Sequence, residues 1–121
     1  MTLLSESLTA KLLAFRDERD WRQFHPPRNL AASVAIEAGE LLECFQWARD
    51  DELEALVARR REAIEDEIAD IVILLNYLCS DLAVDVESIV GRKFAKNALK
   101  YPAELARGSA EKYDKLDGDR K

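Results

Sequence analysis

The chain is poor in the residues that interrupt helices. Its 121 residues include only four glycines and three prolines, and apolar residues nowhere alternate with polar ones as they do in a half-buried strand. This scarcity excludes a fold built from short strands and tight turns. It predicts helices nearly throughout, and the length suits one all-α domain.

Cysteine and histidine are also scarce. Cys44 and Cys79 show no metal-ligand or disulfide spacing, so we expect both to be reduced core residues. The one histidine, His25, precedes Pro26 and Pro27 and does not follow a glutamate by three residues. A di-iron carboxylate bundle needs such Glu-x-x-His pairs, so we do not expect di-iron chemistry. We expect His25 to be structural or on the surface.

Basic charge and long apolar runs are missing as well. The net charge of −6 and the pI of about 4.9 argue against binding to a nucleic-acid polymer, which needs a basic face. A small phosphorylated ligand stays possible, because a divalent cation reverses the charge of a local site. No uncharged run is long enough to span a bilayer, and the first residues do not resemble a signal peptide. We expect no membrane partner and a cytoplasmic location.

Hydrophobic periodicity predicts four main helices and a short one. The main helices are expected at about 4–19, 28–48, 62–82 and 86–100, and the short one holds Leu53, Leu56 and Val57. The expected N-caps are Asn29, Asp50 or Asp51, and Asp85. The predicted domain covers 1–113, and the polar end, 114–121, is expected to be a frayed tail.

The segment from Asn29 to Ala48 contains no lysine or arginine, and its only charges are Glu37, Glu40 and Glu43. At about 100° per residue, steps of three place these carboxylates on one side of a helix. Burying bare carboxylates costs several kcal/mol each, so they must shift their pKa, find cations or bind a metal. The segment therefore predicts a site rather than an ordinary solvated face.

A second apolar run, 68–80, repeats this pattern, since Asp70 is its only charge and Glu67 stands just before it. Two facing helices that carry Glu37, Glu40, Glu67 and Asp70 present four carboxylates to one small volume. Oxygen ligands without histidine or cysteine indicate Mg²⁺, with Mn²⁺ as a substitute. The alternative is that arginines and lysines pair with these acids and merely order the bundle. The role of Glu43 stays open between a metal ligand, a base that orients water, and a partner for Arg49.

Two tryptophans stand near the acidic helix. Trp21 precedes the prolines and Trp47 ends the acidic segment. Aromatic rings at such positions either stack on a nucleobase or pack in the core, and the residues alone leave both uses open.

Polar residues gather near the end of the last predicted helix. Lys93, Asn97 and Lys100 share one face, and Tyr101 follows them. Lysine is a usable phosphate partner and asparagine a base or sugar partner. A solvated face with cations near a helix C-terminus is the alternative.

Five blocks in this order resemble the MazG-like all-α nucleoside triphosphate pyrophosphohydrolases, most closely the dCTP pyrophosphatase branch. The blocks are FRDERDWRQFHPPRNL (15–30), IEAGELLECFQW (36–47), EDEIADIVILL (65–75), GRKFAKNALKYP (91–102) and ELARGSAEKY (104–113). The resemblance covers about 100 of the 121 residues. A lone Glu-x-x-Glu is a weak signal, whereas the ordered set is specific.

The resemblance implies Mg²⁺-dependent hydrolysis between the α- and β-phosphates of a nucleoside triphosphate, which releases pyrophosphate. It also implies a homodimer or a dimer of dimers. The implied metal ligands are Glu37, Glu40, Glu67 and Asp70, and the implied substrate contacts are Trp21, Trp47, Lys93, Asn97, Lys100 and Tyr101. We expect dCTP or a modified pyrimidine analogue as the substrate. The alternatives are a related phosphohydrolase for dUTP or a damaged purine, and a helical interaction module without catalysis.

This chain departs from the family pattern at two places, one in the base pocket and one at the start of the first acidic motif. In the dCTP-type branch a histidine of the first helix and a tyrosine of the fourth line the base pocket, where this chain has Leu12 and Leu74. A pocket without those polar groups does not discriminate bases by the same hydrogen bonds. Many members also begin the first motif with two adjacent acids, whereas Ile36 precedes Glu37 here.

Overall fold

The computed structural model describes residues 3–116, and these are helices joined by turns, without a strand. The predicted all-α class is therefore confirmed. The chain divides into two compact units, Met1–Val84 and Asp85–Lys121, each of which is described by itself. The prediction of a single domain over 1–113 stays a prediction.

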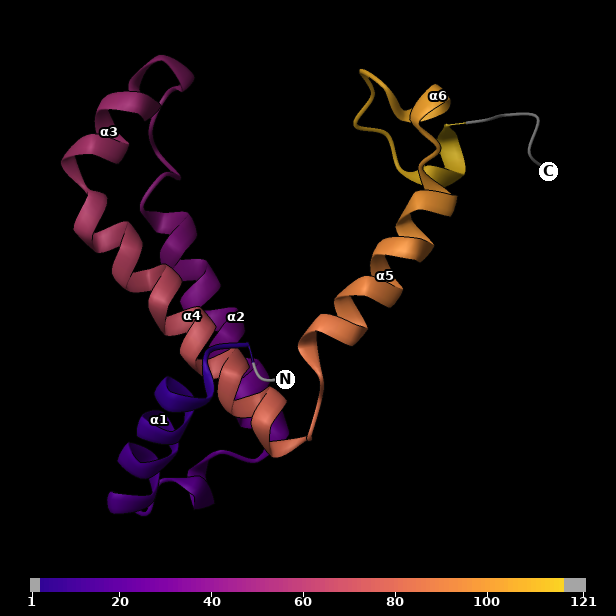
Figure 1. The fold of residues 1–121 in the computed structure, drawn as a ribbon. Helices are drawn as coiled ribbons and strands as arrows, with labels where there is room; N and C mark the ends of the chain where they lie inside the picture. The colour runs from indigo at the N-terminus through magenta and orange to yellow at the C-terminus, as the bar shows by residue number, and fades with distance from the viewer. Residues whose placement is uncertain (1–2, 117–121) are drawn as a thin grey trace. The chain divides into compact units, whose positions relative to one another are not determined.

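The elements follow one another in the order that Figure 1 shows. The first unit contains α1 (Glu6–Glu18), η1 (Arg22–Phe24), α2 (Pro27–Glu43), η2 (Asp50–Glu52), α3 (Leu53–Arg59) and α4 (Arg61–Asp81). The second contains α5 (Val86–Lys100), α6 (Ala103–Ala106) and η3 (Tyr113–Lys115). Within the first unit, α2 and α4 run side by side in opposite directions. Three of the four predicted main helices match α1, α4 and α5 to within two residues at each end.

The start of α2 differs from the prediction. Pro26 is its N-cap and Pro27 its first residue, whereas Asn29 was the predicted cap. Proline suits the first helical position because its fixed φ is helical and its missing N–H would have no helical partner there. Asn29 instead lies in the first turn, and its side-chain amide donates a hydrogen bond to the backbone oxygen of Phe24 at 3.3 Å.

The end of α2 also differs, since the helix ends at Glu43 and not at Ala48. The N–H groups of Cys44 and Phe45 donate to carbonyls three residues back, at 3.1 and 2.9 Å. Such tightened bonds close a helix, so Trp47 lies in a turn beyond α2. The predicted cap at Asp50 or Asp51 is likewise wrong, because both residues belong to η2.

A buried ion pair ties α1 to the end of α4. Arg16 is 1% exposed, and its two terminal nitrogens donate to the two carboxylate oxygens of Asp81 at 2.9 and 2.7 Å. The guanidinium holds the pKa of Asp81 below its usual range. Arg22 adds a longer contact of 3.7 Å to the same carboxylate from an exposed position.

Further buried hydrogen bonds join the same two helices. Asn76, fully buried, accepts a bond from the backbone N–H of Leu4 and donates one to the hydroxyl of Thr9, both at 3.1 Å. The hydroxyl of Tyr77 donates to the backbone oxygen of Leu12 at 2.9 Å. Because buried polar groups are costly unless paired, these bonds fix how α1 lies on α4.

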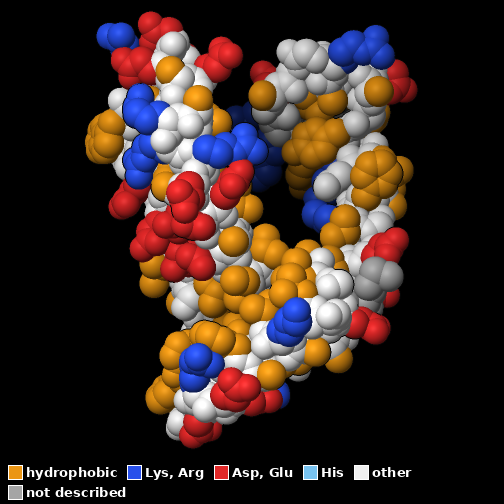
Figure 2. All heavy atoms as spheres, turned by 60° about the vertical axis from the view of Figure 1, so that its left-hand side comes forward, with side chains coloured by type: hydrophobic (Ala, Val, Ile, Leu, Met, Phe, Trp, Pro, Cys, Tyr) orange, Lys and Arg blue, Asp and Glu red, His pale blue; other side chains and the backbone are white. Residues whose placement is uncertain are grey.

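The apolar core of the described residues is small and consists of Leu30, Cys44, Ile64 and Tyr77. Both cysteines are free, as predicted; Cys44 is buried and Cys79 half-buried. Large hydrophobic side chains remain at the surface of both units (Figure 2), and Phe94 and Leu99 of α5 are 72% and 78% exposed. None of the helices in residues 3–116 is long and apolar enough to cross a membrane.

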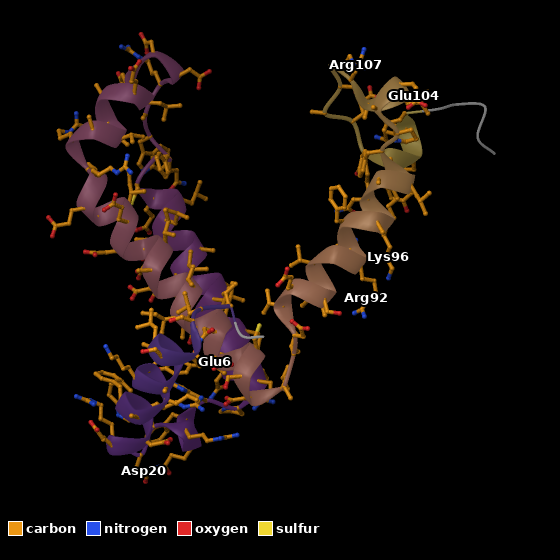
Figure 3. All side chains as sticks on the ribbon, viewed as in Figure 1. Glu6, Asp20, Arg92, Lys96, Glu104 and Arg107 are labelled. Carbon is orange, nitrogen blue, oxygen red and sulfur yellow. The ribbon has the colours of Figure 1, made fainter. Side chains whose placement is uncertain are left out.

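The second unit is built on α5, which begins after its N-cap Asp85 as predicted. Arg92 and Lys96 project from one side of this helix (Figure 3). After α6, the chain turns back to η3, where the ring of Tyr113 meets that of Tyr101 edge to face at 6.2 Å. The predicted tail begins inside η3, and its residues 117–121 lie outside the described part of the chain.

We expect Asp81→Ala to lower the free energy of unfolding by about 3–5 kcal/mol, because it leaves the guanidinium of Arg16 buried without a counter-charge. Urea denaturation followed by circular dichroism measures the change. The matched control is Glu65→Ala, which breaks the exposed pair between Arg61 and Glu65 and should cost less than about 1 kcal/mol. Equal losses in both variants would contradict the assignment.

Candidate metal centre and adjoining cavity

The facing helices α2 and α4 bring three of the four predicted carboxylates together. Glu37, Glu67 and Asp70 each offer one oxygen, and these oxygens lie within 4.8 Å of one another. Glu37 and Glu67 are half-buried and Asp70 is exposed. The cluster arises because α2 and α4 are antiparallel neighbours, so that the middle of one helix meets the first half of the other.

The fourth predicted carboxylate, Glu40, lies one turn further along α2 and is exposed. Its pKa is raised, chiefly by hydrogen bonding and charge repulsion with Glu37. The pKa of Glu37 is raised in turn, first by hydrogen bonding with Glu67 and then by desolvation. Ionised carboxylates this close together repel one another, so that a proton or a cation between these groups is favourable.

No basic side chain supplies that cation within residues 3–116. Arg61 pairs with Glu65 and Arg49 with Glu52, at 2.6 and 3.1 Å, and none of the four predicted ligands forms an ion pair with another described residue. The Oε2 atoms of Glu37 and Glu67 are buried without a hydrogen-bond partner. Buried carboxylate oxygens without a partner, in a cluster that contains no nitrogen or sulfur ligand, fit a hard divalent cation.

Glu43 is the last residue of α2 and is exposed. Its suggested partner Arg49 contacts Asp51 and Glu52 instead. The two other roles considered for Glu43, a metal ligand and a base, stay predictions.

A cavity of about 590 Å³ adjoins the acidic cluster, and two of the clustered acids form part of its wall. Its lining residues come from α1, the η1 segment, α2 and α4: Lys11, Leu12, Phe15, Trp21, His25, Glu37, Asp70, Ile73, Leu74 and Tyr77. Trp21, a predicted base-stacking residue, packs edge to face against Phe15 with ring centroids 5.7 Å apart. An aromatic wall thus stands in the same cavity as carboxylates suited to a metal.

Leu12 and Leu74 both line this cavity. These are the two positions at which the sequence departs from the dCTP-type pattern, so the departure falls on the cavity wall itself. Trp47, in contrast, is 87% exposed and lines neither this cavity nor the smaller one between α1 and α4. Its contact with a base stays a prediction.

Three polar residues of the cavity were not predicted from the sequence: Lys11, His25 and Tyr77. No spacing motif marks them, because they reach the cavity through the packing of α1 and η1 on α4. For His25, the following proline pair was the only local signal, since it directs the chain into α2.

The predicted phosphate-binding residues belong to the second unit. Lys93 and Asn97 are exposed on α5, and Tyr101 follows its end. The ammonium group of Lys100 lies 4.8 Å from the centroid of the Tyr113 ring, a cation–π contact. The shared face of Lys93, Asn97 and Lys100 on α5 exists as predicted. Its contact with a substrate stays a prediction.

Antiparallel helices with clustered carboxylates beside an aromatic-lined cavity define an all-α protein in which an acidic cluster that could hold a cation adjoins a cavity. Residues 32–116 match the MazG-like family, and the chain belongs to this family. It is 46% identical to a pyrophosphatase from Archaeoglobus fulgidus of known crystal structure, with a TM-score of 0.77 over 80% of this chain and 91% of that one.

Two curated relatives are similar over 84% of this chain. dCTP pyrophosphatase 1 from Bos taurus is 45% identical and that from Homo sapiens is 43% identical, each over 104 residues. The match covers 62% and 61% of the lengths of these relatives. The chain therefore spans less than two thirds of the curated proteins that it matches.

We expect Glu37→Gln to raise the melting temperature at neutral pH in the absence of divalent cations. A raised pKa means that the ionised form of Glu37 opposes folding. This penalty is present above the folded-state pKa and vanishes as the pH falls below the ordinary glutamate value of about 4.3. Thermal melts in EDTA from pH 4 to 8 measure the difference between variant and wild type.

The control for this measurement is Glu65→Gln, which removes a charge paired with Arg61 on the same helix and should bring no gain. A lower melting temperature for Glu37→Gln at neutral pH would show that repulsion among the carboxylates is not significant.

Proposed function

We propose that this chain hydrolyses a (deoxy)nucleoside triphosphate to the monophosphate and pyrophosphate in a divalent-cation-dependent reaction. The observation that carries the proposal is the position of Glu37 and Asp70, which belong both to the carboxylate cluster and to the wall of the cavity that holds Trp21. The family membership and the names of the similar proteins support it.

In this proposal Glu37, Glu40, Glu67 and Asp70 hold Mg²⁺, or Mn²⁺ in its place. When bound, the ion supplies positive charge for the phosphates and a coordinated water of lowered pKa. The carboxylates then act as an oriented ligand set, fixed because they project from two packed helices rather than from loops. The orphaned oxygens of Glu37 and Glu67 gain the partner that they lack among the described residues.

The cavity residues position the nucleoside part of the substrate. The indole of Trp21 offers a face on which a base can stack, and Phe15 keeps that ring in place by edge-to-face contact. Leu12, Leu74 and Ile73 make the surrounding wall apolar and displace water from it. Base stacking depends little on the hydrogen-bonding pattern of the base.

The residues of the second unit take the phosphates in this proposal. Lys93 and Lys100 neutralise the charge that develops on the phosphate oxygens, and Asn97 and Tyr101 offer hydrogen bonds to phosphate or sugar. The support is the shared helical face and the family resemblance of this segment.

We propose dCTP or a modified pyrimidine analogue as the first candidate substrate, in keeping with the names of the curated relatives. With leucine at positions 12 and 74, the cavity does not repeat the hydrogen bonds of the dCTP-type pocket. dUTP and damaged purine nucleotides are the alternatives, and a screen for pyrophosphate release across canonical and modified dNTPs decides between them.

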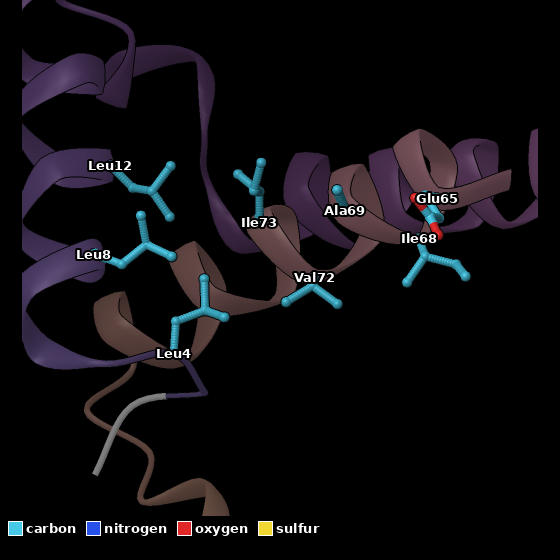
Figure 4. Close-up of a pocket in the computed structure, with 8 residues that line it drawn as sticks. All are labelled: Leu4, Leu8, Leu12, Glu65, Ile68, Ala69, Val72 and Ile73. Carbon is cyan, nitrogen blue, oxygen red and sulfur yellow. The ribbon is translucent and has the colours of Figure 1, made fainter. Parts of the chain in front are cut away.

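We further propose that the chain forms a homodimer or a homotetramer. An apolar cavity of about 360 Å³ lies between α1 and α4, where Leu8 and Leu12 face Val72 and Ile73 across the gap (Figure 4). Ile68 at its edge is 46% exposed. A chain with so small a buried core reduces its exposed apolar area by association.

We expect Glu37→Gln and Glu40→Gln each to abolish pyrophosphate release while the helical circular dichroism spectrum stays unchanged. Each substitution removes one negative charge from the metal ligands and leaves the side-chain volume nearly the same. A coupled pyrophosphate assay with Mg²⁺ measures the loss, and Glu65→Gln on α4 serves as the control that should retain turnover.

A thermal melt separates an enzyme from an interaction module. Mg²⁺ with a non-hydrolysable dNTP at one hundred times its Kd should stabilise the wild type by about 2.7 kcal/mol. The same additions should leave Glu37→Gln nearly unchanged. The assigned site would be refuted if neither the wild type nor Glu37→Gln were stabilised and if Glu37→Gln and Glu40→Gln both kept normal turnover.

For the assembly, we expect sedimentation equilibrium to give a mass of two or four times 13.8 kDa. Ile68→Glu should lower this mass at micromolar concentration, because it places a charge on an apolar contact surface. Glu62→Gln, in the first turn of the same helix, is the control and should leave the mass unchanged. A wild-type mass of one chain would disprove the assembly.

A further inference from the structure

The cavity histidine and a buried arginine pack on the same tyrosine. His25 follows η1, and its ring centroid lies 5.5 Å from that of Tyr77, with 39° between the ring planes. The guanidinium carbon of Arg16 lies 4.7 Å from the centroid of the same tyrosine ring. Arg16 and His25 therefore share one neighbour, and only His25 lines the cavity.

Each of these two side chains buries a nitrogen that has no hydrogen-bond partner: Nε of Arg16 and Nδ1 of His25. The terminal nitrogens of Arg16 are occupied by Asp81. An arginine Nε always carries a hydrogen and is always a donor. No hydrogen bond joins these two nitrogens. An N–H at Nδ1 of His25 would bury a second unpaired donor near the Arg16 cation, whereas a bare Nδ1 places a lone pair there.

The charge state of the His25 ring agrees with a bare Nδ1. Desolvation lowers the pKa of His25, and the positive charge of Arg16 lowers it further, with a smaller opposing effect from Asp81. The ring is then neutral near pH 7, and a neutral imidazole carries its proton on one nitrogen only. With Nδ1 bare, the proton is on Nε2. Within residues 3–116 this second nitrogen has no hydrogen-bond partner and is not among the buried ones.

The other polar groups of the cavity are largely committed elsewhere. The hydroxyl of Tyr77 donates to the backbone of Leu12, and Glu37 and Asp70 belong to the carboxylate cluster. The remaining donors are the indole N–H of Trp21 and the ammonium group of Lys11, both on exposed side chains. His25 is therefore the donor that is held most firmly in the cavity wall.

We propose that His25 contacts the base by donating a hydrogen bond from Nε2 to an acceptor on it, a keto oxygen or an unprotonated ring nitrogen. Arg16 is the positioning residue that keeps His25 in this tautomer. The inference rests on the proposed function, because it assumes that a nucleotide base occupies the cavity. In this proposal His25 supplies a polar contact to the base in a cavity wall where Leu12 and Leu74 supply none.

The first test is the tautomer of the unmodified protein. The chain contains one histidine, so a long-range ¹H–¹⁵N correlation spectrum of the labelled protein reports on His25 alone. We expect a protonated Nε2 and a bare Nδ1 at pH 7. A proton on Nδ1, or a charged ring, would overturn the proposal without any substitution.

The second test adds dCMP to the same sample, with deoxyribose 5-phosphate as the probe that lacks a base. We expect dCMP to move the resonances of Nε2 and its proton, and the sugar phosphate to leave them in place. Equal changes with both probes would show that His25 does not contact the base.

The third test compares His25→Phe with His25→Gln. Phenylalanine keeps a ring without a donor, and the amide nitrogen of glutamine reaches about the position of Nε2. We expect His25→Phe to lower kcat/KM for dCTP about three- to tenfold, the value of one neutral hydrogen bond, through KM and with kcat preserved. His25→Gln should restore most of the loss. Equal losses in both variants, or none in either, would refute the role.

Arg16→Lys tests the positioning role, since it keeps a charge for Asp81 and removes the Nε donor. We expect the fraction of His25 protonated on Nδ1 to rise, whereas a purely structural role for Arg16 leaves the tautomer unchanged. If this variant fails to fold, the wild-type tautomer remains the deciding measurement.

These outcomes separate the inference from the proposed function. A wild type that releases pyrophosphate from no dNTP refutes the function, while the dCMP titration still tests the contact with His25. Normal turnover with the same base preference in His25→Phe refutes the inference alone.

Discussion

The central constraint in this structure is a cluster of carboxylates that repel one another and are nevertheless held close together by two packed helices. Packing of α2 on α4 brings Glu37, Glu67 and Asp70 within 4.8 Å, and no arginine or lysine among the described residues neutralises them. The two helices supply the free energy that opposes this repulsion. Under the proposed function this site is preorganised, because the carboxylates that would hold the cation are already in place before it binds.

A second buried electrostatic contact decides what adjoins that cluster. The bidentate pair of Arg16 and Asp81 and the bond from Tyr77 to Leu12 fasten α1 to the end of α4. The cavity wall therefore includes residues of α1, η1 and α4 in addition to the two acids of the cluster. In the proposed reaction the acids hold the cation, and the buried pair of Arg16 and Asp81 shapes the space beside them.

Local patterns in the sequence predict most of the helices and the three acids that cluster between α2 and α4. The ranges of α1, α4 and α5 follow from hydrophobic periodicity, and the spacing of Glu37 with Glu40 and of Glu67 with Asp70 follows from helical geometry. The early end of α2 depends on backbone hydrogen bonds in its last turn, which the residue types there do not predict. The roles of Arg16 and Tyr77 depend on partners 65 residues apart in the chain, which periodicity cannot identify.

The hydrogen bonds of Asn76 to Leu4 and Thr9 have a consequence for the position of α1 along α4. If α1 slid along α4 by one turn, an amide, a hydroxyl, a guanidinium and a carboxylate would all lose their partners in a dry environment. Apolar contacts alone tolerate such sliding, because one leucine replaces another at little cost. The polar contacts reject it, so that a mostly aliphatic interface has a single permitted setting and the adjoining cavity a single shape.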